Sequence, residues 1–488
     1  MGAIELLGAW DRARERPGYR WGGVALGLAV AAALCAVPVE GLTVTAQRAG
    51  AVSALMAMWW LGGVLPAAVT AMVPLVAFPL LGVAATKDVA APYADPLIYL
   101  MLGGFVLGYA MEAVGLHRRL VALLLAPAWV RARPDRVALA LMAATAAISG
   151  FVSNTGTMVM MLPMGLAMAA HVSASRRVRS AFTLSLAYSC SIGGVATLVG
   201  TAPNAVFAGM AASIAHREVK FVEWMAVGVP FVVLALPVAW FVVNRLTLRL
   251  PDAPDAPILK PARPEWAPGE AAVLTLILAC FALWITRAPM DLGLVKIGGW
   301  GKLLSVKIDD GFVAIAAAMA LFLLPGRDGF LLDWKACAAK IPWGVLLLLG
   351  GGFAMADVIQ SSGLTTFLAE RASGLATLPP WIATGVICIG ISFLSAFTSN
   401  TATTQVALPL LAAGAAVAGV SPLAWMLPAT ISASCDFTLA VGTPPNAIAA
   451  EAGDVSPGDM AFAGFLLNIA CALIATVVSM TFGRWVFG

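Results

Sequence analysis

The segment FVSNTGTMVMMLP at residues 151–163 recurs as FTSNTATTQVALP at residues 397–409. A Ser-Asn-Thr triplet, a later threonine and a Leu-Pro pair keep the same spacing in both copies, with an offset of 246 (399 − 153). Each triplet stands inside apolar sequence, where polar and irregular backbone groups are costly in a membrane unless they have partners. The recurrence therefore indicates a duplicated unit in which the polar triplet has a purpose.

Two further landmarks recur in the same order. The sequence GTAPN at 200–204 is echoed by GTPPN at 442–446, an offset of 242 (442 − 200). Upstream, GGF at 103–105 followed by GL at 115–116 recurs as GGF at 351–353 and GL at 363–364, an offset of 248 (351 − 103). Three landmarks with a near-constant displacement indicate that the two halves of the chain are copies of one unit.

The composition excludes a soluble globular protein. The 488 residues are 61% hydrophobic and only 11% charged, with a mean hydropathy of +0.93, and apolar runs of roughly 20 residues recur along the chain. The net charge of +4 gives no reason to expect a nucleic-acid partner, because the basic residues lie in short loops. The seven cysteines contain no CxxC pair and predict neither a disulfide framework nor a zinc site.

The apolar stretches predict eleven transmembrane spans, several of them interrupted by glycine or proline. They lie near 22–38, 43–62, 64–83, 98–128, 178–212, 222–246, 269–286, 311–325, 342–372, 421–452 and 459–483. We interpret the first as a span and not as a cleaved signal peptide. Segments 137–172 and 380–417 each carry a triplet near the middle, and each could be two tight spans or a re-entrant hairpin.

The distribution of charge decides between these topologies. If both segments are hairpins, most of the 29 lysines and arginines fall on one side of the membrane. The positive-inside rule then places the N-terminus in the cytoplasm and the C-terminus outside. Five spans lie between the two GGF landmarks, and an odd number inverts the second copy. The predicted fold is an all-α polytopic membrane protein, with about eleven transmembrane helices and two re-entrant hairpins in two inverted repeats.

The repeated polar segments have a chemistry suited to ions. A hairpin that turns inside the bilayer leaves helix ends whose amides attract anions. Glycine and proline in the GTxPN segments free backbone carbonyl oxygens, which suit a hard monovalent cation such as sodium. No lysine or arginine lies in the triplets or in the breaks, so bound cations would balance a dianion. Hydroxyl side chains can also serve only to join membrane helices, but this reading leaves the matched offsets unexplained.

The other candidates are less specific. We interpret the paired GGF and GL landmarks as helix packing and a bend. Glu112 and Asp357 lie near helix breaks and are interpreted as solvated or capped carboxylates. Asp436 lies six residues before Gly442, inside a span. An acid in a span is a functional candidate, and Asp436 could shape a cation site, carry a proton or serve as a hydrogen-bonded structural acid.

At these motifs the chain resembles the divalent anion/sodium symporter family of di- and tricarboxylate transporters, and the resemblance extends from about residue 20 to near the end of the chain. It implies a homodimer in the lipid bilayer, in which each protomer has a scaffold and a transport domain that slides like an elevator. It also implies a protein that is not an enzyme and that co-transports sodium ions with its substrate. The implied substrate contacts are Ser153, Asn154, Thr155, Ser399, Asn400 and Thr401, with Thr201, Thr443 and Pro444 close to the ligand.

The resemblance also implies two sodium sites. The first would use Ser149, Ser153, Asn154 and Gly200, and the second would use Ser395, Thr398, Asn400 and Gly442. The chain departs from the family pattern at three places. Ala202 stands where proline is common, Ser395 stands where threonine is frequent, and Asp436 stands where a small neutral residue is expected.

The motifs and the resemblance together divide the chain into five parts. These are a cytoplasmic N-terminal segment (1–21), scaffold helices (22–97), a first inverted repeat with its hairpin (98–250), a cytoplasmic linker (251–268) and a second inverted repeat with its hairpin (269–488). We expect a secondary active transporter of the cell inner membrane that moves C4-dicarboxylates by sodium-coupled symport. A sodium-independent dicarboxylate exchanger of the same fold and a sulfate or oxyanion carrier are the alternatives.

Overall fold

A computed structural model describes residues 17–255, 258, 265–287, 289–291, 296–302, 308–326, 329–371, 377–452 and 455–488. Most of the segment 1–21, part of the segment 251–268 and much of the loop 288–310 lie outside the described residues.

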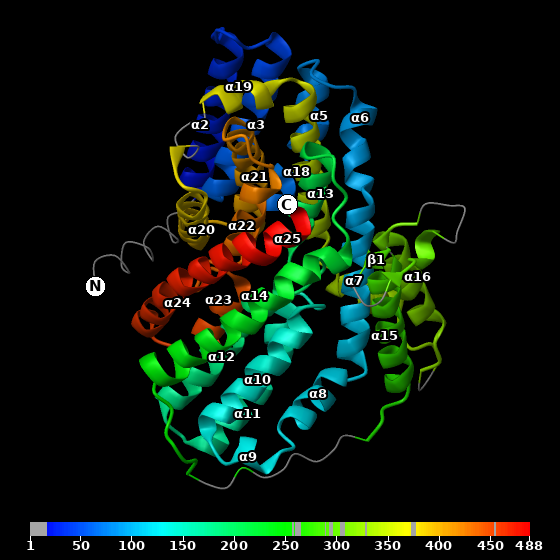
Figure 1. Ribbon diagram of the computed structural model, residues 1–488, viewed down its shortest axis with the longest axis vertical. Helices are drawn as coiled ribbons and strands as arrows, with labels where there is room; N and C mark the ends of the chain where they lie inside the picture. The colour runs from blue at the N-terminus through cyan, green and yellow to red at the C-terminus, as the bar shows by residue number, and fades with distance from the viewer. Residues whose placement is uncertain are drawn as a thin grey trace.

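The described chain is built almost entirely of helices (Figure 1). The N-terminal part contains α2 (Pro17–Ala36), α3 (Val44–Gly62), α4 (Ala67–Thr70), α5 (Val73–Leu80), α6 (Thr86–Ala90), α7 (Pro96–Ala113), α8 (Leu116–Leu124) and α9 (Ala128–Arg131). The middle contains α10 (Pro134–Ser149), α11 (Asn154–Val172), α12 (Arg176–Gly194), α13 (Ala202–Ile214), α14 (Phe221–Phe241), α15 (Glu270–Arg287) and α16 (Asp310–Leu323). The C-terminal part contains α17 (Trp334–Lys340), α18 (Trp343–Ser361), α19 (Leu364–Arg371), α20 (Pro380–Ala396), α21 (Asn400–Val417), α22 (Leu423–Ala433), α23 (Pro444–Ala452), α24 (Pro457–Val478) and α25 (Arg484–Phe487). A two-residue antiparallel pair, β1 (Met290–Asp291) and β2 (Lys296–Ile297), lies between α15 and α16.

This architecture confirms the all-helical membrane fold. Within the described residues, seven helical stretches are long and apolar enough to cross a bilayer, and five shorter apolar stretches accompany them. Several expected spans are divided as the glycines and prolines predict. The stretch near 64–83 consists of the short helices α4 and α5, and the stretch near 342–372 bends at Gly363, which has a φ of +82°. Left-handed backbone of this kind favours glycine.

Both GTxPN segments interrupt their helices as predicted. Helix α12 ends at Gly194 and α13 begins at Ala202, while α22 ends at Ala433 and α23 begins at Pro444. Proline fits the first turn of a helix because the amide of that turn has no intrahelical partner. Each GTxPN segment therefore ends one irregular stretch and begins a new helix.

Each Ser-Asn-Thr triplet lies where two helices fold back on one another. Helices α10 and α11 meet at the first triplet, and α20 and α21 meet at the second. The Ser153 hydroxyl caps α11 by accepting a hydrogen bond from the Gly156 amide. The first pair extends toward α8 and α9, whereas the second extends toward α19 and α3, at the opposite end of the molecule (Figure 1).

The repeated GGF landmarks are packing sites, as interpreted from the sequence. A methyl group on Gly103 would lie 2.6 Å from the backbone of Ala314, so α7 approaches α16 closely at this point. A methyl group on Gly351 would lie 2.3 Å from the carbonyl oxygen of Ala71. Both positions therefore allow backbones to approach where a side chain would separate them.

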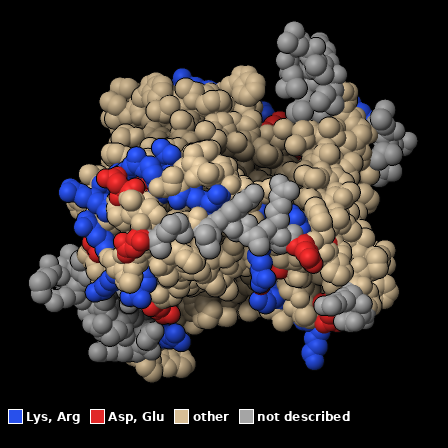
Figure 2. Space-filling model, turned by 90° about the horizontal axis from the view of Figure 1, so that it is seen from below, with Lys and Arg blue, Asp and Glu red and all other residues tan. Residues whose placement is uncertain are grey.

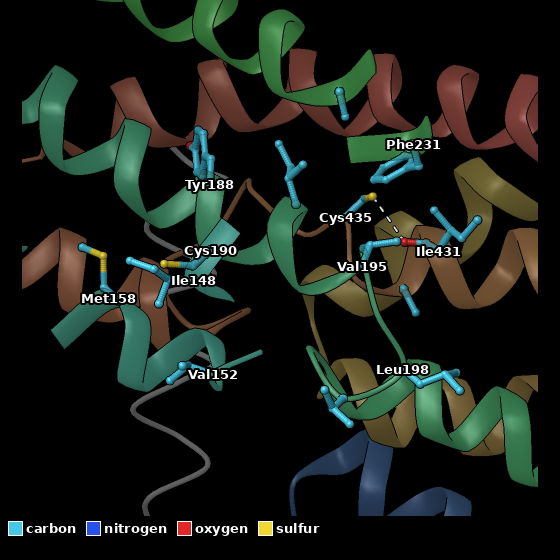
Figure 3. Packing of buried hydrophobic residues seen from close by; sticks show 14 of the residues in the cluster. Ile148, Val152, Met158, Tyr188, Cys190, Val195, Leu198, Phe231, Ile431 and Cys435 are labelled. Atoms are coloured by element: carbon cyan, nitrogen blue, oxygen red, sulfur yellow. Dashed lines mark hydrogen bonds between the residues drawn. The ribbon is translucent and has the colours of Figure 1, made fainter. Parts of the chain in front are cut away.

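A large apolar core joins the two halves of the chain (Figure 3). Figure 3 shows side chains from α10, α11, α12, α14 and α22 gathered around the connections that follow α12 and α22. Tyr188 on α12 is fully buried, and its hydroxyl lies 3.0 Å from the carbonyl oxygen of Phe437 and 3.3 Å from that of Met460. This contact ties the first half of the chain to the second.

Basic side chains gather on one end of the molecule. The face seen in Figure 2 carries many lysine and arginine side chains. It is the end of the molecule at which α8 and α9 lie in Figure 1. The arginines of these elements include Arg118 and Arg119 on α8, Arg131 on α9 and Arg136 on α10.

Candidate functional site

Both triplets and both broken helices converge on one cavity of about 830 Å³. The triplet residues, one flanking threonine and the breaks supply most of the polar groups in its wall: Ser153, Asn154, Thr155, Thr398, Ser399, Asn400, Thr401, Gly200, Thr201, Gly442, Thr443 and Pro444. The structure thus brings together segments that are separated by about half of the chain. Ser149 and Ser395 do not line this cavity, because both are fully buried behind the triplets.

Four helices begin at the cavity wall. Helices α11 and α21 start at Asn154 and Asn400, and α13 and α23 start in the two GTxPN segments. The first amides of a helix have no intrahelical partner and carry partial positive charge. Four such ends around one space form a strong site for anionic groups such as carboxylates.

The asparagine of each triplet is held by a serine five residues earlier, at the end of the preceding helix. The Ser149 hydroxyl lies 2.8 Å from Asn154 Oδ1 and 2.7 Å from the Cys190 carbonyl oxygen. In the second half, the Ser395 hydroxyl lies 2.9 Å from Asn400 Oδ1 and 2.7 Å from the Ala433 carbonyl oxygen. One hydroxyl carries one proton and can satisfy only one of these two acceptors at a time. Each half therefore gathers three oxygen atoms around a single proton, an arrangement that favours a bound cation.

The broken helices are fixed by matching hydrogen bonds. Asn204 Nδ2 donates to the carbonyl oxygens of Gly194 and Thr197 at 2.9 and 2.7 Å. Asn446 Nδ2 donates to the carbonyl oxygens of Asp436 and Leu439, both at 3.1 Å. Every partner is displaced by 242 residues (446 − 204, 436 − 194 and 439 − 197). The asparagine of each GTxPN segment thus holds the irregular backbone that the glycine and proline create.

The first break is also tightly packed. A methyl group on Gly200 would lie 2.4 Å from the Gly194 carbonyl oxygen and 3.1 Å from that of Gly150. Backbone oxygens of the hairpin and of the break therefore meet at Gly200, and only a residue without a side chain fits there.

A charged pair that the sequence does not predict also lines the cavity. Lys340 at the end of α17 lies 3.5 Å from Glu112 near the end of α7, and both residues line the cavity. Lys340 is the one basic side chain among the described lining residues. The position of Lys340 just before the span near 342–372 indicates a charge at the end of a helix. Its pairing with Glu112 cannot be predicted from the sequence, because the two residues are 228 positions apart. The interpretation of Glu112 as a solvated carboxylate is incomplete, because Glu112 also lines the cavity.

The other two acids have different surroundings. Asp357 on α18 is exposed and accepts a hydrogen bond from Ser213, so it is a partnered carboxylate, as interpreted from the sequence. Asp436 is fully buried between α22 and α23. Neither of its carboxylate oxygens has a hydrogen-bond partner among the described residues. This observation does not support a hydrogen-bonded structural role for Asp436.

Comparisons with known proteins identify the family of the chain. The profile of the citrate transporter family matches residues 55–430. The sodium-dependent dicarboxylate transporter SdcS of Staphylococcus saprophyticus is 33% identical over 450 residues, which cover 88% of this chain and 84% of the relative. The transporter of the same name from a Staphylococcus aureus strain is 34% identical over the same length and coverage. The chain belongs to the divalent anion/sodium symporter family. It is therefore a membrane transporter and not an enzyme, as the resemblance implied.

A solved structure supports the fold. The chain is similar to the crystal structure of the YdaH transporter of Alcanivorax borkumensis, with a TM-score of 0.57 and 15% sequence identity. The similarity covers 81% of this chain and 87% of the YdaH chain. At this identity the comparison bears on the fold alone.

Proposed function

We propose that this protein is a secondary active transporter that moves C4-dicarboxylates of the succinate, malate or fumarate type, together with sodium ions. The observation that carries the proposal is the convergence of both triplets and both broken helices on one cavity. Two relatives at 33% and 34% identity bear the name sodium-dependent dicarboxylate transporter, which supports the same substrate class and the same coupling ion.

Two helix-end groups recognise the two ends of the substrate. One carboxylate is bound by Ser153, Asn154 and Thr155, and the other is bound by Ser399, Asn400 and Thr401. Thr201, Thr443 and Pro444 flank the ligand from the broken helices. Each helix end carries roughly half a unit of positive charge, and hydroxyl and amide donors add directed hydrogen bonds. This division of labour suits a short, linear dianion with a carboxylate at each end.

Sodium ions supply the remaining positive charge. The first ion is bound by Ser149, Ser153, Asn154 and Gly200, and the second by Ser395, Thr398, Asn400 and Gly442. The hydrogen bonds from these buried serines to the half-buried asparagine oxygens support these positions. Lys340 cannot balance the dianion because Glu112 already neutralises it. Cations that bind beside the substrate therefore couple its transport to their own gradient.

The transport domain moves as a unit between the two faces of the membrane. We propose that 98–250 and 269–488 form inverted repeats joined by the cytoplasmic linker 251–268, and that 22–97 belong to the scaffold of a homodimer. The matched hydrogen bonds at Asn204 and Asn446 support the repeat, and the opposite placement of the two hairpins supports the inversion (Figure 1). An elevator-type movement would carry both hairpins together, because Tyr188 bonds one half to the other.

The basic face lies in the cytoplasm of the cell, with the N-terminus inside, the C-terminus outside and the protein in the inner membrane. The cavity extends to Glu112 near the end of α7, which runs toward the basic face (Figures 1 and 2). In this orientation the cavity extends toward the cytoplasmic side of the protein.

Uptake into proteoliposomes tests the proposal. The purified protein should accumulate radiolabelled succinate when a sodium gradient is imposed, and should stop when potassium replaces sodium. Unlabelled malate and fumarate should compete, and sulfate should not. Sodium-independent uptake that requires internal dicarboxylate would refute the coupling in favour of exchange, and competition by sulfate alone would refute the substrate class.

A further inference from the structure

Asp436 is a buried acid that the proposed transport site leaves without a role. Its side chain is 0% exposed. The backbone amide of Thr438 faces the carboxylate, but neither oxygen has a hydrogen-bond partner among the described residues. No described lysine or arginine acts on it. A buried carboxylate without a partner is costly, and the described residues supply no positive charge that would offset this cost.

The side chains near Asp436 are mostly apolar, which increases the effect of its unpaired charge. Cys435, the neighbour of Asp436 in the chain, lies among buried apolar side chains that include Val195, Phe231 and Ile431 (Figure 3). In an apolar environment a charge is poorly screened and acts strongly on its neighbours. A cation near Asp436 would therefore be bound firmly.

The duplication relates the position of Asp436 to an equivalent position in the first half of the chain, next to the first proposed cation site. The offset of 242 aligns Asp436 with Gly194 (436 − 194), and the asparagines Asn446 and Asn204 bond to the carbonyl oxygens of these two residues. A side chain added at Gly194 would begin 2.5 Å from Asn154 Oδ1. The position therefore borders the first proposed cation site. In the second half the same position carries a carboxylate.

The glycines of the two breaks point to the same conclusion. A methyl group on Gly200 would lie 2.4 Å from the carbonyl oxygen of Gly194, whereas a methyl group on Gly442 would lie 1.8 Å from Oδ2 of Asp436. Each glycine thus faces an oxygen atom of the residue six positions earlier. In the first half this atom is a neutral carbonyl oxygen, and in the second half it is a carboxylate oxygen beside a residue of the second cation site.

We propose that the Asp436 carboxylate binds the cation of the second site and gives this site a negative charge that the first site lacks. The inference rests on the proposed function, because it takes the second cation to lie near Ser395, Asn400 and Gly442. Sodium prefers oxygen ligands, and an ionised ligand strengthens the site. The second site then binds sodium more tightly than the first and fills before it.

Thermal unfolding of the purified protein at increasing sodium, without dicarboxylate, tests this inference. Potassium chloride keeps the ionic strength constant. Sodium should raise the melting temperature of the parent, and Asp436→Asn should need roughly tenfold more sodium for the same shift. In sodium-free buffer this variant should melt higher than the parent, because it lacks the unpaired buried charge. Asp436→Gly, which restores the residue of the first half, should likewise need more sodium.

Asp357→Asn is the matched control, because it makes the same change at an exposed, hydrogen-bonded acid of α18. It should leave the sodium dependence as in the parent. An Asp436→Asn protein with the sodium dependence of the parent, or with a lower melting temperature without sodium, would overturn the inference. The proposed function would stand in that case if the parent still shows sodium-driven uptake. If sodium neither stabilises the parent protein nor drives its uptake of substrate, both the inference and the proposed function are refuted.

Discussion

Replacing Gly200 by alanine tests whether the first broken helix is as tightly packed as its geometry indicates. The added methyl group would lie 2.4 Å from the Gly194 carbonyl oxygen, 3.0 Å from the Gly194 carbonyl carbon and 3.1 Å from the Gly150 carbonyl oxygen. All three are backbone atoms, so rotation of a side chain cannot relieve the overlap. The break itself has to move, and with it the oxygens proposed to bind the first sodium ion.

The size of the effect follows from the overlap. Overpacking of a filled site costs about 1–3 kcal/mol, and each 1.4 kcal/mol is a factor of about ten in an equilibrium constant. We therefore expect uptake at limiting sodium to fall by about 5- to 150-fold for Gly200→Ala. The assay is sodium-driven uptake of radiolabelled succinate into proteoliposomes, normalised to the amount of reconstituted protein.

Gly150→Ala is the matched control at the tip of the first hairpin. A methyl group there has the Ala147 carbonyl oxygen at 3.5 Å as its nearest neighbour, which is an ordinary contact, and Gly150 has a φ of −62° that alanine adopts freely. We expect its uptake to stay within about twofold of the parent. Normal uptake by Gly200→Ala, or an equal loss in Gly150→Ala, would refute the reasoning from packing.

Three further predictions concern the hairpins, the charged pair and the basic face. Asn154→Ala and Asn400→Ala should each abolish uptake while the protein still elutes as a folded species on size-exclusion chromatography, since each loses a substrate donor and a cation ligand together; full transport by either would contradict the site. Lys340→Gln should slow uptake a few-fold at low ionic strength and have little effect at high salt, because it leaves the Glu112 carboxylate unpaired at the cavity wall, and an unpaired negative charge repels anions over a distance that salt shortens; a loss independent of salt would point to direct binding instead. Burial lowers the pKa of His117 below its ordinary value of 6.5, with Arg118 adding to the effect, so the unfolded chain takes up the proton more readily. The folded protein therefore keeps its full stability above about pH 6.5 and loses part of it as the pH falls, because protonation of His117 favours the unfolded chain. His117→Gln should flatten the decline in melting temperature between about pH 8 and pH 5. An unchanged decline would show that other groups cause it.

The sequence predicted the parts of the site that break a local rule. Ser153 and Ser399 stand out because a polar triplet is costly inside apolar sequence, and the duplication marks the two as equivalent. The helix interruptions at Gly200 and Gly442 follow from the chemistry of glycine and proline alone. The triplets and the breaks meet at one cavity because of the tertiary structure. The only sign of this in the sequence is that both motifs are repeated.

The remaining features depend on contacts between distant segments. Lys340 and Glu112 belong to different helices and look like ordinary charges at the ends of spans. The sequence marks Asp436 as an acid in a span, but its lack of a hydrogen-bond partner among the described residues depends on neighbours that are distant in the chain.

The lack of a lysine or arginine at the hairpin tips has a consequence for the return half of the transport cycle. A fixed cation at the tips would leave an uncompensated charge in the empty transporter. The free energy needed to move this charge across the membrane would slow the return step after each substrate release. When dissociable sodium ions supply the counter-charge instead, the tips lose most of this positive charge as the substrate and the ions dissociate. The hairpin tips then add little electrostatic cost to the return step, and the buried charge that remains is the Asp436 carboxylate, which a sodium ion retained at the second site would neutralise.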